Sequence, residues 1–118
     1  MTMTFEKMMK NIEDQLYIFE EGFAEERGIP DVAHLIAQDK VRYDVVIMMY
    51  EQFREIGDQY PDHALDNCIE YLDMQIRWDT NRATVISGDI DNIDDYDRLV
   101  IDGLRILKFC TEYDFENE

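Results

Sequence analysis

Apolar residues recur at steps of three and four along the first part of the chain, the spacing that places side chains on one face of an α-helix. The residues on this face are Phe5, Met8, Met9, Ile12, Leu16, Phe19 and Phe23. The spacing predicts a long amphipathic helix over residues 3–27. Gly28 then ends this helix, and Pro30 suits the first turn of the next one because its missing N–H would be unpaired there.

Similar spacing predicts helices over residues 30–37 and 40–56, the second capped by Asp39, and the two could also form one continuous helix. The segment from Val45 to Tyr50 is apolar on every side. A helix with that property is usually the central helix of a bundle.

A third long helix is expected after Pro61, and it should end near Arg82. Residues 83–91 then predict a loop with a short extended piece. The last helix should run over residues 92–112, with Asp91 or Asn92 as its cap.

The expected fold class is all-α, a small bundle of four to five helices that run mostly antiparallel because short loops join them. The 118 residues correspond to one domain. We therefore expect residues 1–118 to form a single acidic helical domain with a short acidic tail at 114–118. The expected core residues are Leu16, Phe19, Val45, Met48, Leu72, Val100, Leu104 and Leu107.

The net charge is the most unusual part of the composition. The 28 acidic residues outnumber the 11 basic ones by 17, whereas about 2 to 8 net charges suffice to keep a small domain in solution. A surface of this sign repels nucleic acid and anionic membranes. The natural partners are basic proteins, including basic grooves that are built for nucleic acid.

Few residues suit catalysis, and we expect the protein not to be an enzyme. Ser87 is the only serine, and the two histidines, His34 and His63, fall on different expected helices. Cys68 and Cys110 lack the spacing of a zinc or redox motif, which predicts buried free thiols. We expect no cofactor, no metal, no membrane contact and a cytoplasmic location, since neither a signal peptide nor a spanning segment is present.

Two acidic stripes are the strongest functional signal. On the third expected helix, acidic side chains follow one another at steps of four, four and three residues, and the first helix carries a second group. Carboxylates four residues apart on a helix are separated by about 6 Å, close to the separation of successive phosphates along a strand. The candidate partner-binding residues on the two stripes are Glu13, Glu20, Glu21, Glu25, Asp62, Asp66, Glu70 and Asp73.

The segment 89–97 adds a third acidic group, from which Asp91, Asp94 and Asp95 join the candidate partner-binding residues. The run resembles a calcium loop in composition only. An EF-hand needs glycine at the sixth position and glutamate at the twelfth, where this chain has Asp94 and Val100. Capping of the following helix and compensation of its dipole explain these aspartates more simply.

The small size, excess of acid, helical pattern and acidic tail make the chain similar to the phage-encoded DNA mimics that block restriction enzymes or CRISPR effectors. The resemblance covers composition over the whole chain and no aligned motif, so no residue role is carried over from that class. It implies a stoichiometric inhibitor, often a homodimer, that acts in a bacterial cytoplasm if it is phage-encoded. Its partner would be a basic nucleic-acid-binding protein or nuclease complex, with no direct contact to nucleic acid.

Two alternatives remain open. Immunity proteins and antitoxins that neutralise cationic nuclease toxins are also small, acidic and often helical. The acidic residues Glu20, Glu21 and Glu25 with Glu70 and Asp73 resemble the magnesium-holding motifs of all-α nucleotide pyrophosphatases of the MazG type. Here the first group has an extra residue between its acids and the second lies too far along the chain, which puts this metal-dependent alternative in doubt.

Overall fold

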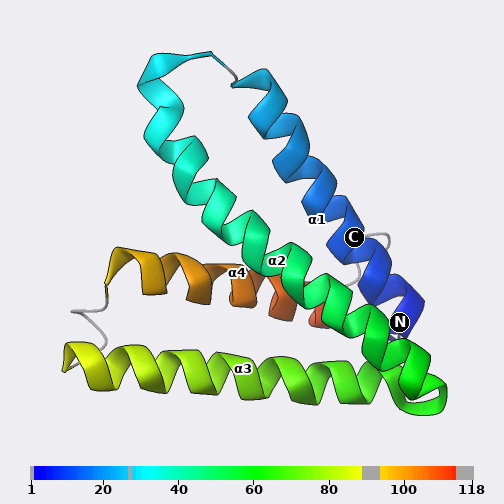
Figure 1. Ribbon diagram of the computed structural model, residues 1–118. Coiled ribbons are helices and arrows are strands. Elements are labelled where there is room, and N and C mark those ends of the chain that lie inside the picture. The colour runs from blue at the N-terminus through cyan, green and yellow to red at the C-terminus, as the bar shows by residue number, and fades with distance from the viewer. Residues whose placement is uncertain (1, 27, 89–93, 114–118) are drawn as a thin grey trace.

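The computed structural model describes residues 2–26, 28–88 and 94–113, which form an all-α bundle (Figure 1). The four helices are α1 (Phe5–Glu25), α2 (Ala33–Gln59), α3 (Ala64–Ser87) and α4 (Asp95–Glu112). Short 3-10 turns, η1 (Pro30–Val32) and η2 (Pro61–His63), precede α2 and α3. No strand occurs in the described ranges, so the expected fold class is confirmed.

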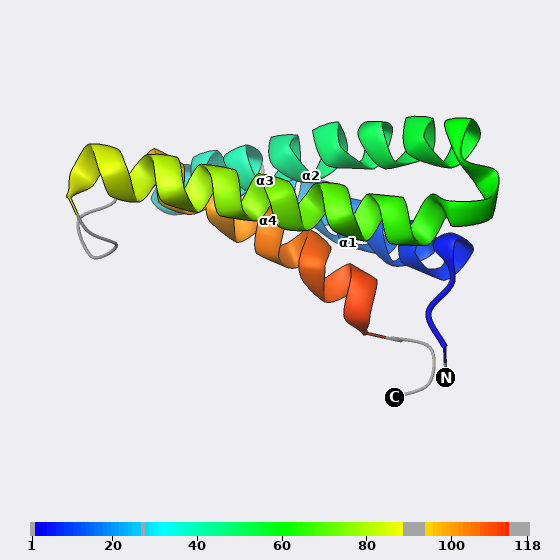
Figure 2. The same ribbon diagram turned by 90° about the horizontal axis from the view of Figure 1, so that it is seen from below.

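Consecutive helices run in opposite directions, and the α1–α2 pair is inclined to the α3–α4 pair (Figure 1). The view from below shows α3 and α4 running side by side (Figure 2). The helix α2 contacts α1, α3 and α4, and most extensively α4. This confirms the prediction that the helix containing residues 45–50 is the central one.

One apolar core joins all four helices. Met8, Ile12, Val46, Phe53 and Leu72 are each completely buried there. Of the expected core residues, Leu16, Val45, Leu72, Leu104 and Leu107 are buried, and Phe19 and Val100 pack against the core while partly exposed.

The expectation that Met48 lies in the core is wrong, because its side chain is 56% exposed. The inward positions of α2 are taken by Val45, Val46, Met49 and Phe53, which occupy one face. Met48 lies outside this face, about 110° around the helix from its centre. Continuous apolar sequence therefore gave no information on which side of α2 faces the core.

The boundaries of α2 also differ from the expectation in one respect. Asp39 does not cap a separate helix, because α2 is continuous from Ala33 to Gln59. Asp39 lies inside it, and its carboxylate pairs with the guanidinium of Arg42, one turn later, at 2.7 Å.

The third helix continues past Arg82, so the expected loop is wrong for residues 83–87. Ala83 is buried against Ile101 of α4, and this contact stabilises the last turn of α3. The helix then ends at Gly88, whose φ of 94° is the left-handed conformation that glycine adopts without strain. The remaining residues of the expected loop, 89–91, and the acidic tail at 114–118 lie outside the described residues. The expectation that Asp91 or Asn92 caps the last helix is wrong, because α4 begins at Asp95 and its cap is Asp94.

Candidate partner-binding surface

Exposed carboxylates continue at steps of three and four from the end of α2, through the η2 turn, into α3. We call these six residues the acidic ridge: Glu51, Glu55, Asp58, Asp62, Asp66 and Glu70. All six are exposed. The ridge follows the end of the bundle at which α2 turns into α3 (Figure 1).

The turn itself favours acidic residues. Pro61 begins η2, and Asp62 and Asp66 lie in the first turns of η2 and α3. Neither helix start has a side-chain cap, so backbone N–H groups there lack a helical partner. Negative side chains are stabilised next to this positive end of the helix dipole, which partly offsets the repulsion among them.

The ridge keeps most of its charge. Within the described residues, none of its six carboxylates has an ion-pair partner within 4.0 Å. Arg54 lies beside the ridge on α2, but its guanidinium donates a hydrogen bond to the Tyr50 hydroxyl at 3.0 Å and stacks over that ring. The hydrogen bond to Tyr50, together with Coulombic attraction from carboxylates including Asp58, raises the pKa of Arg54.

Asp73, the last residue of the predicted α3 stripe, is different from the ridge. The ammonium group of Lys108 on α4 lies 2.8 Å from its carboxylate. This hydrogen bond raises the pKa of Lys108. Asp73 therefore joins α3 to α4, and its negative charge is largely compensated within the protein.

Three residues of the predicted stripe on α1, Glu20, Glu21 and Glu25, lie on a separate surface, whereas Glu13 is close enough to Arg54 that, besides the hydrogen bond to Tyr50, its charge raises the pKa of that residue, as Asp58 does. Figure 1 shows α1 and α3 diverging from the end of the bundle where both begin, so Glu20, Glu21 and Glu25 lie far from the ridge. Glu13, Glu20, Glu21 and Glu25 are all exposed.

Two of these glutamates have tyrosine partners. Tyr43 of α2 donates a hydrogen bond from its hydroxyl to Glu20 at 2.8 Å, and Tyr17 donates one to Glu21 at 2.7 Å. These bonds raise the pKa of both tyrosines. Glu20 and Glu21 are thus held in place by neighbours, whereas no hydrogen bond or ion pair within the described residues holds the ridge carboxylates.

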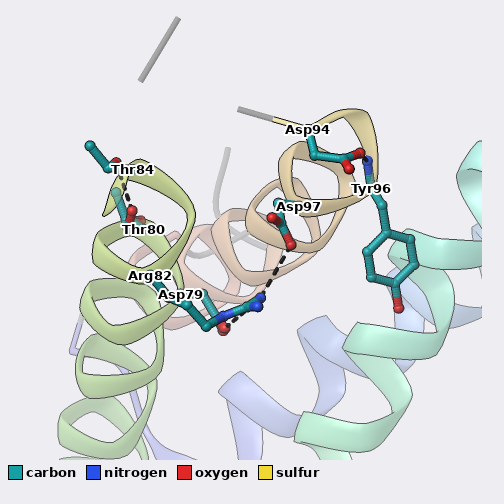
Figure 3. A network of polar contacts seen from close by, with 7 residues as sticks. All are labelled: Asp79, Thr80, Arg82, Thr84, Asp94, Tyr96 and Asp97. Carbon is teal, nitrogen blue, oxygen red and sulfur yellow. Dashed lines mark hydrogen bonds and ion pairs between the residues drawn. The ribbon is translucent and has the colours of Figure 1, made fainter. Parts of the chain in front are cut away.

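The aspartates before α4 have a structural role. Asp94 caps the helix, because its carboxylate accepts a hydrogen bond from the backbone N–H of Tyr96 at 2.9 Å (Figure 3). Asp95 is exposed in the first turn. Arg82 of α3 reaches across to Asp97 at 3.1 Å and also lies 3.9 Å from Asp79 (Figure 3). The third acidic candidate, Asp91, lies outside the described residues.

No metal site is formed by the described residues. They contain no group of three or more histidine, cysteine, aspartate or glutamate side chains that could hold a metal ion. Glu20, Glu21 and Glu25 of α1 form no such group with Glu70 and Asp73 of α3, the residues that resemble the pyrophosphatase motifs. No described helix has the length and apolar character needed to cross a membrane.

The two cysteines are buried free thiols, as predicted. Burial raises the pKa of Cys68 and of Cys110 to about 12. Because the thiolate is the reactive form, neither residue suits nucleophilic chemistry at neutral pH.

The sequence analysis missed half of the ridge. Glu51, Glu55 and Asp58 continue the spacing of the α3 stripe upstream at steps of four and three. Glu51 and Glu55 lie in the helix expected over residues 40–56, directly after its apolar segment, and Asp58 lies just beyond the expected end of that helix.

The chain matches no family model, no curated protein and no solved structure.

Proposed function

We propose that the protein is a stoichiometric inhibitor that mimics nucleic acid and occupies the basic groove of a nucleic-acid-binding protein, such as a restriction or CRISPR effector. The observation that carries this proposal is the acidic ridge, with six exposed carboxylates and no ion-pair partner for any of them within the described residues.

The spacing of the ridge supports the proposal. Asp66 and Glu70 lie one turn apart, so their helical rise is about 6 Å, close to the spacing of phosphates along a strand. The same rise separates Glu51 from Glu55 on α2. A groove lined with lysine and arginine would meet carboxylates held at nearly phosphate-like intervals along α2 and again along α3.

The physics of association follows from this charge. Opposite potentials speed the encounter of two proteins and suppress wrong partners, because like charges facing each other cost several kcal/mol. The helices that carry the carboxylates are already folded, so the backbone of the inhibitor loses little conformational freedom on binding. Inhibition then requires no chemistry, only occupation of the groove at a one-to-one ratio.

The proposal is tested by competition. The protein is used as bait in extracts of its natural host at low and at high salt, and each captured protein is assayed for binding to labelled duplex DNA or RNA. Addition of the protein should release the labelled nucleic acid stoichiometrically, and capture should fall steeply with salt. Recovery of only neutral or acidic partners would refute the proposal.

A matched pair of variants shows whether the ridge is the contact. Asp66→Lys with Glu70→Lys reverses two ridge charges, and Glu26→Lys with Asp31→Lys changes the net charge equally at the α1–α2 turn, the other end of α2 (Figure 1). Competition should be lost in the first variant and retained in the second. Equal effects of the two variants would reject the ridge as the contact surface.

The immunity-protein alternative has a distinct outcome in the same assay. A mimic should compete with nucleic acid on several basic proteins, whereas an immunity protein binds one cognate toxin tightly. Capture of a single nuclease toxin that still binds nucleic acid in the complex would assign the protein to that second class.

A further inference from the structure

The helix α3 has a second apolar surface, which runs from Tyr71 at the edge of the core to the exposed Val85. Tyr71, Met74, Trp78 and Val85 lie along one side of it, within about 60° of each other at 100° per residue. We call these four residues the α3 strip. Met74, Trp78 and Val85 are 53%, 68% and 82% exposed. A contiguous apolar surface of this kind normally marks an interaction site.

The two ends of the strip have complementary shapes. At one end Val85 projects into solvent. At the other end a shallow cavity of about 300 Å³ is lined by Tyr60, Asn67, Glu70, Tyr71 and neighbouring side chains. Asn67 and Val85 are 18 residues apart, which is five full turns, so they lie on the same side of α3 about 27 Å apart.

We propose that the α3 strip is the interface of an antiparallel homodimer, in which α3 packs against α3 of a second copy about a two-fold axis at the level of Ile76. Asn67 and Val85 are equally distant from Ile76, and so are Met74 and Trp78. Val85 of each copy therefore enters the cavity beside Asn67 of the other copy. Trp78 packs on Met74 of the other copy, and both contacts occur twice because the interface is isologous.

The charges along the strip favour the same partner. The two-fold axis keeps each edge of the strip on its own side of the interface. On one edge, Glu70 comes within about 7.5 Å, measured along the helix, of Arg77 of the second copy, a gap that these long side chains can span.

A second copy fits the strip better than a basic protein does. Arg77 and Arg82 both lie beside the exposed Trp78, as residues that line the surface around it. Arg82 is paired with Asp97 and Asp79, but Arg77 has no ion-pair partner within the described residues. A cationic partner would be repelled by Arg77, whereas the second copy supplies both the apolar surface and the carboxylate of Glu70. The dimer surface and the acidic ridge therefore lie on neighbouring sides of α3 and share Glu70 at their common edge.

Salt separates this inference from the proposed function. Two copies of net charge −17 repel each other over a range of about 10 Å at 0.1 M salt and about 3 Å at 1 M salt. Dimerisation through the apolar strip should therefore strengthen with salt, whereas binding to a basic partner should weaken. Failure to dimerise would not refute the inhibitor proposal, and failure to bind a basic partner would not refute the dimer.

Sedimentation velocity of the full chain tests the dimer. In about 0.5 M salt, we expect the mass to rise with concentration from 14.1 kDa toward twice that value. Trp78→Glu should raise the dissociation constant of the dimer at least about 30-fold, because both copies lose a central aromatic anchor. Ile18→Glu, on an equally exposed apolar residue of α1, should leave it unchanged. A monomer at every concentration up to about 1 mM would overturn the proposal.

A charge exchange tests the antiparallel arrangement. Glu70→Arg places two cations together at each edge contact, and Arg77→Glu places two anions there, so each single variant should weaken the dimer. The double variant restores opposite charges and should recover the wild-type dissociation constant. If circular dichroism shows intact helices and the double variant stays as weak as the single ones, the antiparallel arrangement is wrong.

Discussion

Asn11 is the most informative place to perturb the bundle, because it is the polar side chain that joins α1 to the end of α4. It is 4% exposed, and its side-chain amide donates hydrogen bonds to the backbone carbonyls of Cys110 at 3.1 Å and Tyr113 at 2.9 Å. Carbonyls at the end of a helix have no helical partner of their own. Asn11 therefore supplies two bonds that the C-terminus of α4 would otherwise lack.

Asn11→Ala removes both donors and should lower the free energy of unfolding by about 2 kcal/mol, at about 1 kcal/mol per net hydrogen bond. Asn11→Asp should cost more, about 4 kcal/mol at neutral pH, because a buried carboxylate would face two carbonyl oxygens without a compensating charge. At about 4 °C per kcal/mol, the melting temperatures should fall by about 8 and 16 °C.

Urea denaturation of both variants at about pH 7 and about pH 4 checks this reasoning. Burial should raise the folded-state pKa of the carboxyl in Asn11→Asp, so its penalty is absent below the unfolded value of about 3.9 and grows as pH rises through the folded value. Asn81→Asp, on the exposed face of α3, is the matched control and should change stability by only a few tenths of a kcal/mol. If Asn11→Asp is as stable as Asn11→Ala at neutral pH, the contact described here does not exist.

Three further predictions concern packing, pH and thiol chemistry. Gly103→Ala should lower the free energy of unfolding by about 1 kcal/mol, because an added Cβ would lie 3.0–3.2 Å from atoms of α2. Gly22→Ala should raise it by about 0.5–1 kcal/mol, because nothing lies within 4 Å of the added Cβ, and urea titrations measure both changes. The pKa of Lys108 is raised in the folded protein, so its contribution to the free energy of unfolding is present below about pH 10.5 and is lost as pH rises through the folded-state pKa. Between about pH 9 and 12, Lys108→Met should therefore lose stability less steeply than wild type. Both cysteine thiols should react with a thiol reagent at about pH 8 only as fast as the protein unfolds, and labelling within seconds would contradict their burial.

The helices could be predicted from the sequence because the evidence for them is local. Apolar residues three and four apart indicate one face of a helix, and glycine or proline marks its ends. The starts of α1 and α2, near Phe5 and Pro30, followed from this alone.

The wrong predictions concern residues whose burial or helical conformation depends on contacts with other helices. Met48 has apolar neighbours on both sides in sequence, but only packing against the other helices selects which face of α2 is buried. The last turn of α3 contains Thr84, Val85 and Ile86, which have low helix propensity, and the contact of Ala83 with α4 overrides that preference. A contact between residues 83 and 101 leaves no trace in local sequence.

The candidate surface was predictable in part for the same reason. Asp62, Asp66 and Glu70 show their shared face by spacing within one helix. The pattern continues backwards through a turn to Glu51, but this could not be predicted because it depends on which face of α2 is exposed. That Asp73 is compensated depends on Lys108, 35 residues later.

The central claim is that the ridge replaces phosphate in a cationic groove, and the association rate tests it most directly. Stopped-flow measurements at about 0.05 M salt would follow binding to the nucleic-acid-binding protein captured from the host, comparing wild type with the two charge-reversal pairs of equal net charge. The account predicts that Asp66→Lys with Glu70→Lys slows association at least about tenfold, while Glu26→Lys with Asp31→Lys slows it much less. Equal slowing by both pairs would show that only net charge matters and would contradict a mimic surface on α2 and α3.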